Sequence, residues 1–446
     1  MANTYLTRTP SSAGNRQTWT VSIWFKRGNL SGSNIALLTA DGAGDIETFI
    51  RFRDTNLLQI STWNGSGYDF DLRTNRLFRD TSAWYHVVVA ADTTQGTASN
   101  RIKLYVNGVQ ETSFSTETYP SVDYNTYINT TVPQIIGSNG GSSYFDGSMS
   151  HIHFIDGTAY DASAFGETDA TTGEWEGKTS PSVTYGTNGF FILKDGNGIT
   201  DQSGEGNDFT LGGGTLTDLK DNPDNVFATM NPLDNYYQGS TFSNGNNTVV
   251  SGSSSTTFNT STLMMTSGKY YVEVKPTAGS ATSQIGVTGR LAVNATSTLA
   301  VTTSAVGYLD SGSVWGSNSN QGGTWSTYSN NDIIGIAVDC DNNKLYFSKN
   351  GVWQNSGVPT SGSTGTGAIS LTAPSSTTNG AYAFAMNETW NDNTRTWQWN
   401  FGNGYFGTTA ITTNSGNGYA GAEGASKFNY TVPTGYSALN TKGLNE

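Results

Sequence analysis

Cysteine and charged side chains are scarce in this chain. Only one cysteine, Cys340, occurs among 446 residues, so no disulfide can form within the chain. Charged residues make up 13% of the sequence, whereas glycine alone accounts for 54 positions. Such a composition would be typical of a disordered chain, but 11 Trp, 22 Tyr and 20 Phe are enough to build apolar cores. We therefore expect an ordered protein with a largely neutral polar surface.

The sequence also has no basic run and no long apolar run. Its formal net charge is -13, which disfavours binding to nucleic acid through phosphate neutralisation. No stretch of about 18 apolar residues is present, so we expect no membrane insertion. The opening residues, MANTYLTRTP, contain no apolar signal core, and we expect synthesis and folding in a reducing cytoplasm.

Apolar residues at helical spacing are missing as well, and strand patterns take their place. Residues 18–26 (TWTVSIWFK) alternate, which puts Trp19, Val21, Ile23 and Phe25 on one face of a half-buried strand. The pairs Asn107-Gly108 and Asn350-Gly351 predict tight hairpin turns. Further strands are predicted at 84–91, 101–106, 269–275, 333–339, 344–349, 381–386 and 397–401. Short strands separated by Gly, Asn and Asp turns predict an all-β fold of sandwiches or barrels.

Two loop-like stretches divide the chain. Residues 201–215 are rich in glycine, and residues 221–234 carry two prolines in a polar context. We expect a first domain over 1–215, a linker over 216–240, a second domain over 241–435 and a C-terminal tail over 436–446.

The order of several segments resembles two known β-sandwich families. TWTVSIWFKR, WYHVVVAAD, KLYVNGVQ and YFDGSMSHIHFIDG resemble the strands of a laminin-G/concanavalin A-like jelly roll. GKYYVEV, NDIIGIAVDCDNNKLYFSKNGVW and WNFGNGYF resemble the SPRY (B30.2-like) sandwich. The resemblances imply two β-sandwich domains in that order. The loops that carry ligand specificity in the SPRY family are long and rich in Ser, Thr and Gly here, so no peptide ligand is implied.

The combination of segments resembles structural proteins of marine bacteriophages, including cyanophages. MANTYLTRT, DNPDNVFATMNPLDN and VPTGYSALNTKGLNE carry this resemblance. It implies a virion protein (a tail fibre, adsorption or head-decoration component) that contacts other virion proteins and a receptor on the host surface, which we expect to be a glycan. Multivalent display strengthens weak contacts, so we also expect a homo-oligomer.

Motifs for catalysis are missing. Glucanases with a concanavalin A-like fold carry their carboxylates as E-x-D-x-E or E-x-D-x-x-E, as the resemblance implies. The nearest segment, Glu167-Thr168-Asp169, has threonine at both 171 and 172 and lies in a polar stretch that we expect to be a loop. No G-x-S-x-G elbow is present at a strand-to-helix turn. We therefore expect a protein that is not an enzyme.

The chain has three histidines and one thiol that could carry chemistry. His151 and His153 are two residues apart on a predicted strand and could bind a metal, although no third ligand is signalled by spacing. The alternative is a pair of hydrogen-bonding side chains. We expect His86 in the core, and Cys340 as a small core or turn residue.

One acidic segment could bind calcium. Asp41, Asp45 and Glu47 in DGAGDIE offer oxygen ligands, but their spacing does not match an EF-hand loop, and an ordinary glycine turn is the alternative. No other cofactor is expected.

Several aromatic residues could bind sugars. Sugars stack on exposed rings framed by polar side chains, and the candidates are Trp63, Tyr68, Trp315 and Trp325, each of which could instead pack in a core. A virion recognition protein is the first hypothesis. A free carbohydrate-binding, lectin-like protein and a polysaccharide-degrading enzyme are the alternatives.

Overall fold

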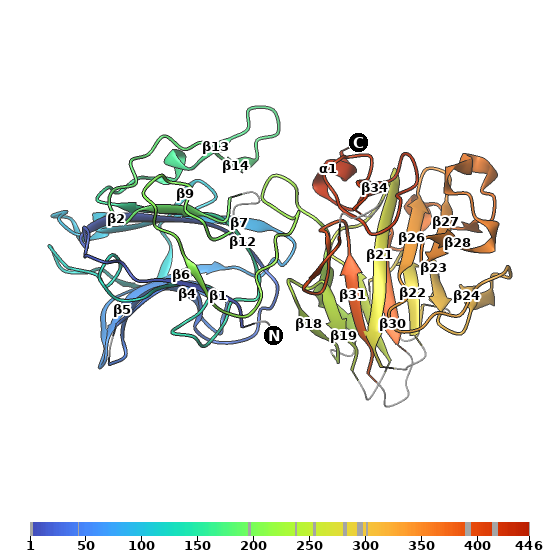
Figure 1. Ribbon diagram of the computed structural model, residues 1–446, viewed down its shortest axis with the longest axis horizontal. Helices are drawn as coiled ribbons and strands as arrows, with labels where there is room; N and C mark the ends of the chain where they lie inside the picture. Colours follow the sequence, from blue (N-terminus) through green and yellow to red (C-terminus); the bar gives the residue numbers. More distant parts are fainter. Residues whose placement is uncertain are drawn as a thin grey trace. The chain divides into compact units, whose positions relative to one another are not determined.

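The structure is a computed structural model that divides into two compact units, Met1–Asp218 and Leu219–Glu446 (Figure 1). It describes residues 3–42, 44–194, 198–236, 239–252, 256–279, 283–291, 298–299, 302–388, 394–412 and 418–445. Residues 216–240, predicted to form a linker, contain strand β17 (Met230–Tyr236). Residues 436–446, predicted to form a tail, contain β34 (Ser437–Ala438) and the short helix α1 (Thr441–Leu444). In the described part, no helix is long and apolar enough to cross a membrane.

The first unit contains two large antiparallel sheets. The eight-stranded sheet has, in order, β10 (Phe114–Thr118), β6 (Tyr68–Leu77), β5 (Leu57–Asn64), β4 (Ile46–Phe52), β3 (Ile35–Gly42), β11 (Gln134–Ile136), β1 (Tyr5–Arg8) and β16 (Thr210–Gly213). The six-stranded sheet has β15 (Phe190–Ile192), β12 (Gly147–Asp156), β2 (Thr18–Arg27), β7 (Trp84–Asp92), β8 (Ile102–Val106) and β9 (Val109–Glu111).

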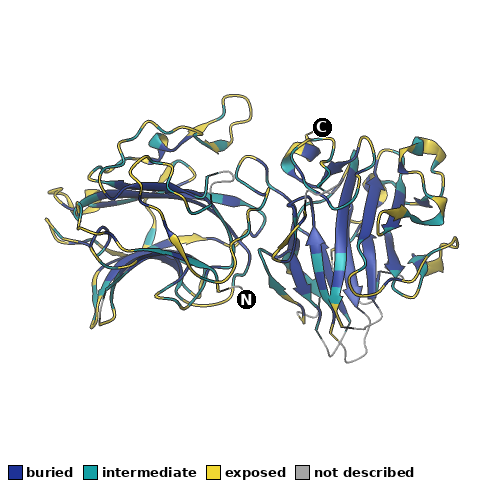
Figure 2. Cartoon of the chain, viewed as in Figure 1, coloured by how far each residue is buried: buried dark blue, intermediate teal, exposed yellow. Residues whose placement is uncertain are grey.

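These two sheets form a β-sandwich around one apolar core. Figure 2 shows the strands of both sheets largely buried. Val21 and Ile23 of β2 belong to the same buried cluster as Ile50 of β4 and Ile60 of β5. In β2 and β4 the inward side chains alternate with outward ones, because successive side chains of a strand point to opposite faces. The predicted inward face of β2 is therefore confirmed.

The prediction that β2 is half-buried was wrong, because its second face is covered too. Ser22 and Trp24, which point away from the sandwich core, are both buried. They lie beneath residues 158–185, which we call the flap. The flap includes the hairpin of β13 (Gly166–Thr168) and β14 (Trp175–Gly177) and packs on this sheet through Phe165 and Trp175.

Both predicted Asn-Gly turns are confirmed, and they share the same backbone conformation and the same type of side-chain hydrogen bond. Asn107 and Gly108 have φ of 47° and 80°, and Asn350 and Gly351 have φ of 49° and 79°. These values match a tight hairpin turn whose twist suits the flanking strands. In each turn the asparagine Oδ1 accepts a backbone N–H from an earlier part of the chain, from His86 in β7 at 2.8 Å and from Ile333, just before β26, at 2.8 Å.

The second unit is also a sandwich of two sheets. Its seven-stranded sheet has β17, β20 (Thr257–Ser261), β30 (Ala383–Glu388), β22 (Ser283–Thr288), β23 (Ala305–Leu309), β24 (Ser313–Gly316) and β25 (Ser319–Asn320). The nine-stranded sheet has β18 (Thr241–Ser243), β19 (Thr248–Val250), β31 (Thr396–Asn400), β21 (Lys269–Ala278), β26 (Ile334–Asp339), β27 (Lys344–Lys349) and β28 (Val352–Trp353), with β29 (Ile369–Ser370) on β27 and β34 on β21.

Side chains from both sheets of the second unit form its core. Ile285 and Phe384 of one sheet share a buried cluster with Ile336 and Trp399 of the other. Cys340 lies in the same cluster, where burial raises the pKa of its thiol to about 12. The thiol is therefore protonated at neutral pH, as fits the small core residue that was expected. The predicted fold class, all-β with two β-sandwich domains, is confirmed.

Candidate functional site

Four predicted site residues of the first unit form one row across the eight-stranded sheet. Asp41 of β3 pairs directly with Glu47 of β4, Glu47 with Trp63 of β5, and Trp63 with Tyr68 of β6. Residues directly opposite one another on neighbouring strands project from the same face of a sheet. The row lies on the face away from the sandwich core, because the core residues Ile50 and Ile60 point the other way. We call this surface the outer face.

The aromatic end of the row is partly open to solvent. The rings of Trp63 and Tyr68 meet edge to face, with centroids 5.0 Å apart and planes inclined by 70°. Both side chains have intermediate exposure. Tyr68 also contacts the ring of Phe49, which is fully buried beneath it. The ring of Trp63 is thus held by its neighbour while part of its surface remains available to a ligand.

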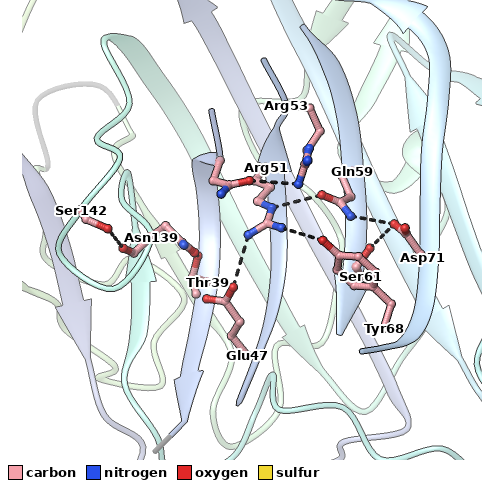
Figure 3. A network of polar contacts seen from close by, with 11 residues as sticks. Thr39, Glu47, Arg51, Arg53, Gln59, Ser61, Tyr68, Asp71, Asn139 and Ser142 are labelled. Atoms are coloured by element: carbon pink, nitrogen blue, oxygen red, sulfur yellow. Dashed lines mark hydrogen bonds and ion pairs between the residues drawn. The ribbon is translucent and has the colours of Figure 1, made fainter. Parts of the chain in front are cut away.

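Arg51 organises the outer face (Figure 3). Its guanidinium carbon lies 3.5 Å from the centroid of the Phe49 ring, a cation–π geometry. Its nitrogens donate to Gln59 Oε1 at 3.1 Å, to Glu47 Oε1 at 3.3 Å and to the Tyr68 hydroxyl at 3.3 Å. Because only 5% of the Arg51 side chain is exposed, these contacts fix the positions of Glu47 and Tyr68.

A second set of polar contacts extends the network across β5 and β6. Asp71 accepts hydrogen bonds from Gln59 Nε2 at 2.7 Å and Ser61 Oγ at 2.6 Å, and forms an ion pair with Arg73 at 2.7 Å. Each of these groups would lose a partner if another moved, which limits their motion, although Arg73 Nε is buried and has no hydrogen-bond partner of its own among the described residues. The outer face is therefore preorganised.

Burial and like charges shift the acidic groups of the row. Burial raises the pKa of Asp41, and the nearby Asp45 carboxylate raises it further. Burial also raises the pKa of Glu47, against the opposing effect of the Arg51 guanidinium. Charged carboxylates at this position would be stabilised by groups that donate hydrogen bonds or carry positive charge.

The calcium hypothesis had placed Asp41, Asp45 and Glu47 in one metal site. Among the residues that the structure describes, no three Asp, Glu, His or Cys side chains are arranged to hold a metal ion. Asp41 and Glu47 instead belong to the same row as Trp63, a connection that the sequence reasoning missed.

The two aromatic candidates of the second unit differ in their surroundings: Trp315 lies on strand β24, whereas Trp325 lies in the loop that follows β25. Trp315 pairs with Gly307 on β23 and Asn320 on β25 and has intermediate exposure. Its neighbour Val314 points into the core. Trp325 packs on the core instead, with ring centroids 5.7 Å from Tyr308 and 6.1 Å from Phe347.

The three histidines lie on the flap side of the six-stranded sheet and have hydrogen-bond partners. His86 is buried, as predicted; its Nε2 lies 2.8 Å from Ser22 Oγ, and its Nδ1 accepts from Trp175 Nε1 at 2.9 Å. Burial lowers the pKa of His86 to about 3. His151 and His153 both lie on β12, as predicted, but a bulge interrupts the pairing with β2 between Ser150 and His153, where His151 has φ of 47°.

The segment that carries Glu167 and Asp169 is a hairpin, so the loop prediction was wrong there. Glu167 on β13 pairs with Glu176 on β14, and both are exposed. Asp169 Oδ1 accepts backbone N–H bonds from Thr171 at 2.8 Å and Thr172 at 2.6 Å, which lower the pKa of its carboxyl. These contacts form the turn of the hairpin.

Sequence reasoning also missed the residues that support the site. Arg51, Gln59, Ser61 and Asp71 alternate with core residues along β4, β5 and β6. Alternation in IETFIRF and LLQISTWN was a usable signal, because it separates an apolar face from a face that contains Phe49 among polar residues.

Comparison with known proteins gives one family match. The family model described as the concanavalin A-like lectin/glucanases superfamily (Laminin_G_3) matches residues 2–163, within the first unit. This match supports the concanavalin A-like jelly roll predicted for the first half and suggests carbohydrate or other ligand binding. None of the curated proteins compared with the chain matches it.

Solved structures resemble parts of the chain. The SPRY domain of human HERC1 is 18% identical, with 38% of this chain and 96% of that chain covered and a TM-score of 0.29. Stonustoxin is 20% identical, and the match covers 39% of this chain and 27% of the stonustoxin chain, with a TM-score of 0.28. The match thus spans about a quarter of the stonustoxin chain. A SAP-like pentraxin from Limulus polyphemus is 18% identical, and the match covers 36% of this chain and 72% of the pentraxin chain, with a TM-score of 0.26. At these values the likenesses support no statement about function.

Proposed function

We propose that this chain binds glycans through the outer face of the eight-stranded sheet and does so as a non-enzymatic component of a bacteriophage particle. The observation that carries the binding proposal is the row of Asp41, Glu47, Trp63 and Tyr68, which joins a partly exposed aromatic pair to two carboxylates through direct cross-strand pairs.

This combination suits the chemistry of a sugar ring. The C–H faces of a pyranose are apolar and pack on an aromatic surface, which Trp63 offers. The hydroxyl groups around the ring need hydrogen-bond partners, and the carboxylates of Asp41 and Glu47 accept while the Tyr68 hydroxyl can donate. Arg51 fixes Glu47 and Tyr68 before the ligand arrives, so less conformational entropy is lost on binding.

The virion setting is supported by the resemblance of several segments to marine bacteriophage proteins. In this setting the chain contacts other virion proteins, assembles as a homo-oligomer and presents the outer face toward the host surface. Multivalency then raises the strength of attachment above that of a single weak site.

Replacement of one ring tests the binding site. Trp63→Ala removes the stacking surface, and we expect at least about a tenfold loss of glycan affinity, equivalent to ~1.4 kcal/mol. Calorimetry with oligosaccharides found by glycan-array screening measures this loss. Trp315→Ala is the matched control, because it removes a similarly exposed tryptophan from the other unit. Equal affinity of the wild type and Trp63→Ala would show that the ligand binds elsewhere.

Immunogold electron microscopy tests the setting. Antibody against the purified chain should label phage particles from the source culture, at the tail for an adsorption protein or over the head for a decoration protein. Glycan binding without labelled particles would favour a free lectin. A monomeric mass by light scattering at micromolar concentration would contradict the expected homo-oligomer.

A further inference from the structure

We infer that the outer face selects neutral glycans over anionic ones, with Asp41 and Glu47 as the residues that determine this specificity. The inference rests on the proposed glycan-binding function and adds the class of ligand. It depends on where the acidic and basic groups lie relative to Trp63.

The two carboxylates lie next to the ring on which a sugar would stack. Glu47 is the direct cross-strand neighbour of Trp63, and Asp41 is the direct neighbour of Glu47. Neighbouring strands are about 4.8 Å apart, so a sugar stacked on Trp63 meets Glu47 about one strand spacing away and Asp41 about two spacings away. An anionic substituent placed there would lie close to two negative charges, with Asp45 nearby in the β3–β4 turn.

The hydrogen-bonding capacity of the row matches hydroxyl groups. Arg51 occupies Glu47 Oε1, and within the described residues no partner is present for Oε2, which can accept a ligand hydroxyl. The Tyr68 oxygen accepts from Arg51, so its own proton can be donated. A neutral sugar supplies both donors and acceptors, whereas a uronate or sulfate group supplies only acceptors.

The nearby guanidinium groups do not compensate for this acidity. Arg51 is paired with Glu47, and Arg73 is paired with Asp71. Arg53 donates to the neutral Asn34 Oδ1 and follows the opposite end of β4 from Glu47. Five residues separate Arg53 from Glu47 along the chain, a backbone rise of about 20 Å. The Arg53 charge acts on the Arg51 guanidinium, and the charged groups that shift the pKa of Glu47 are Arg51, Asp41 and Asp45.

The test compares neutral and anionic saccharides of equal length. Hexose oligosaccharides without charged groups and uronate oligosaccharides are titrated into the full chain at 20 mM and 500 mM NaCl. We expect at least about tenfold tighter binding of the neutral member at the lower salt concentration, with the difference shrinking at the higher one because salt screens repulsion.

Charge-removing variants then identify the residues responsible. Asp41→Asn with Glu47→Gln should raise uronate affinity several-fold at low salt while neutral affinity stays equal or falls. Glu167→Gln is the matched control, because it removes one exposed carboxylate from the flap hairpin of the same unit. The control should leave the ratio of the two affinities unchanged.

The outcomes separate the inference from the proposed function. If uronate and neutral saccharides bind equally well and Trp63→Ala weakens the binding of both, the inferred selectivity is contradicted, whereas glycan binding at the outer face is supported. If the double variant and Glu167→Gln change the ratio of neutral to uronate affinity equally, the overall charge of the protein determines selectivity. That result would contradict the role inferred for Asp41 and Glu47. If the wild type binds no saccharide, both the function and the inference are overturned.

Discussion

One buried carboxyl holds a segment of the C-terminal part of the second unit against strand β21. Glu273 on β21 is fully buried, and its two oxygens accept the backbone N–H groups of Asn429 and Tyr430, both at 2.8 Å. Asn400 Nδ2 also donates to Glu273 Oε2 at 3.3 Å, and the Tyr271 hydroxyl donates to Glu273 Oε1 at 3.2 Å. Burial nevertheless raises the pKa of Glu273 to about 7, because these hydrogen bonds only partly replace water.

This raised pKa predicts a defined pH dependence of stability. Between about pH 4.5 and 7 the folded chain keeps a proton that the unfolded chain has lost, so the free energy of unfolding falls as the pH rises. Glu273→Gln resembles the protonated side chain and does not titrate. Between pH 5 and pH 8 we expect the variant to gain on the order of 2 kcal/mol relative to the wild type. Urea unfolding at both pH values measures this gain, and parallel pH curves for the two proteins would contradict it.

Individual residues of the candidate site were only partly predictable from the sequence. Trp63 and Tyr68 could be proposed because sugars stack on aromatic rings framed by polar side chains, as in STWNGSGYDF. Trp325 looked equivalent in sequence, yet its ring packs on Tyr308 and Phe347. Whether a loop tryptophan is covered depends on side chains from distant strands, and no local pattern contains that information.

Hairpins are the elements that the sequence predicted best. Asn107-Gly108 and Asn350-Gly351 form the expected turns because both positions require positive φ, which Asn and Gly adopt at low cost. Strand alternation predicted the core face of β2 for a similar local reason. The opposite face of β2 was not predictable, because its cover is the flap, whose polar sequence FGETDATTGEWEG shows no strand alternation.

The contact between a hairpin and the flap gives the next prediction. A Cβ on Gly108 would approach the Trp175 ring to 2.5 Å, and the φ of 80° is itself unfavourable for alanine. Gly204 has a φ of 92° and nothing within 4 Å of such a Cβ. Gly204→Ala should therefore cost only the backbone term of about 1 kcal/mol, and Gly108→Ala about 1–3 kcal/mol more through overpacking. Urea unfolding of the two variants measures the difference between their free energies of unfolding. Equal destabilisation would show that the Trp175 ring can move aside at little cost.

The row on the outer face was beyond sequence reasoning for a different reason. Asp41, Glu47, Trp63 and Tyr68 belong to four successive strands, so their alignment depends on the register of three hairpins. A shift of one residue in any hairpin would turn a side chain to the opposite face. The β5–β6 register shifts between Thr62 and Trp63, and the bulge directs Trp63 and Tyr68 to the same side.

On the scale of the whole molecule, each unit is closed by pairing its own first and last segments. In the first unit, β1 pairs with β16 near the end of that unit. In the second, Phe227 forms a bridge with Asn440, and the backbone N–H of Thr441 donates to Val226 O at 3.0 Å. Each unit also has its own buried apolar cluster, which is the usual requirement for a domain that folds alone.

We therefore expect residues 1–218 and 219–446 to fold when they are produced as separate chains. Each should unfold cooperatively in urea, because its core and its closing strands are complete, and the sum of their far-ultraviolet circular dichroism spectra should reproduce that of the full chain. The first fragment should keep the glycan affinity of the full chain, since the row from Asp41 to Tyr68 and its Arg51 support lie within it. A folded first fragment with lost affinity would place part of the binding site in the second unit. A first fragment that fails to fold would show that its sandwich needs the rest of the chain.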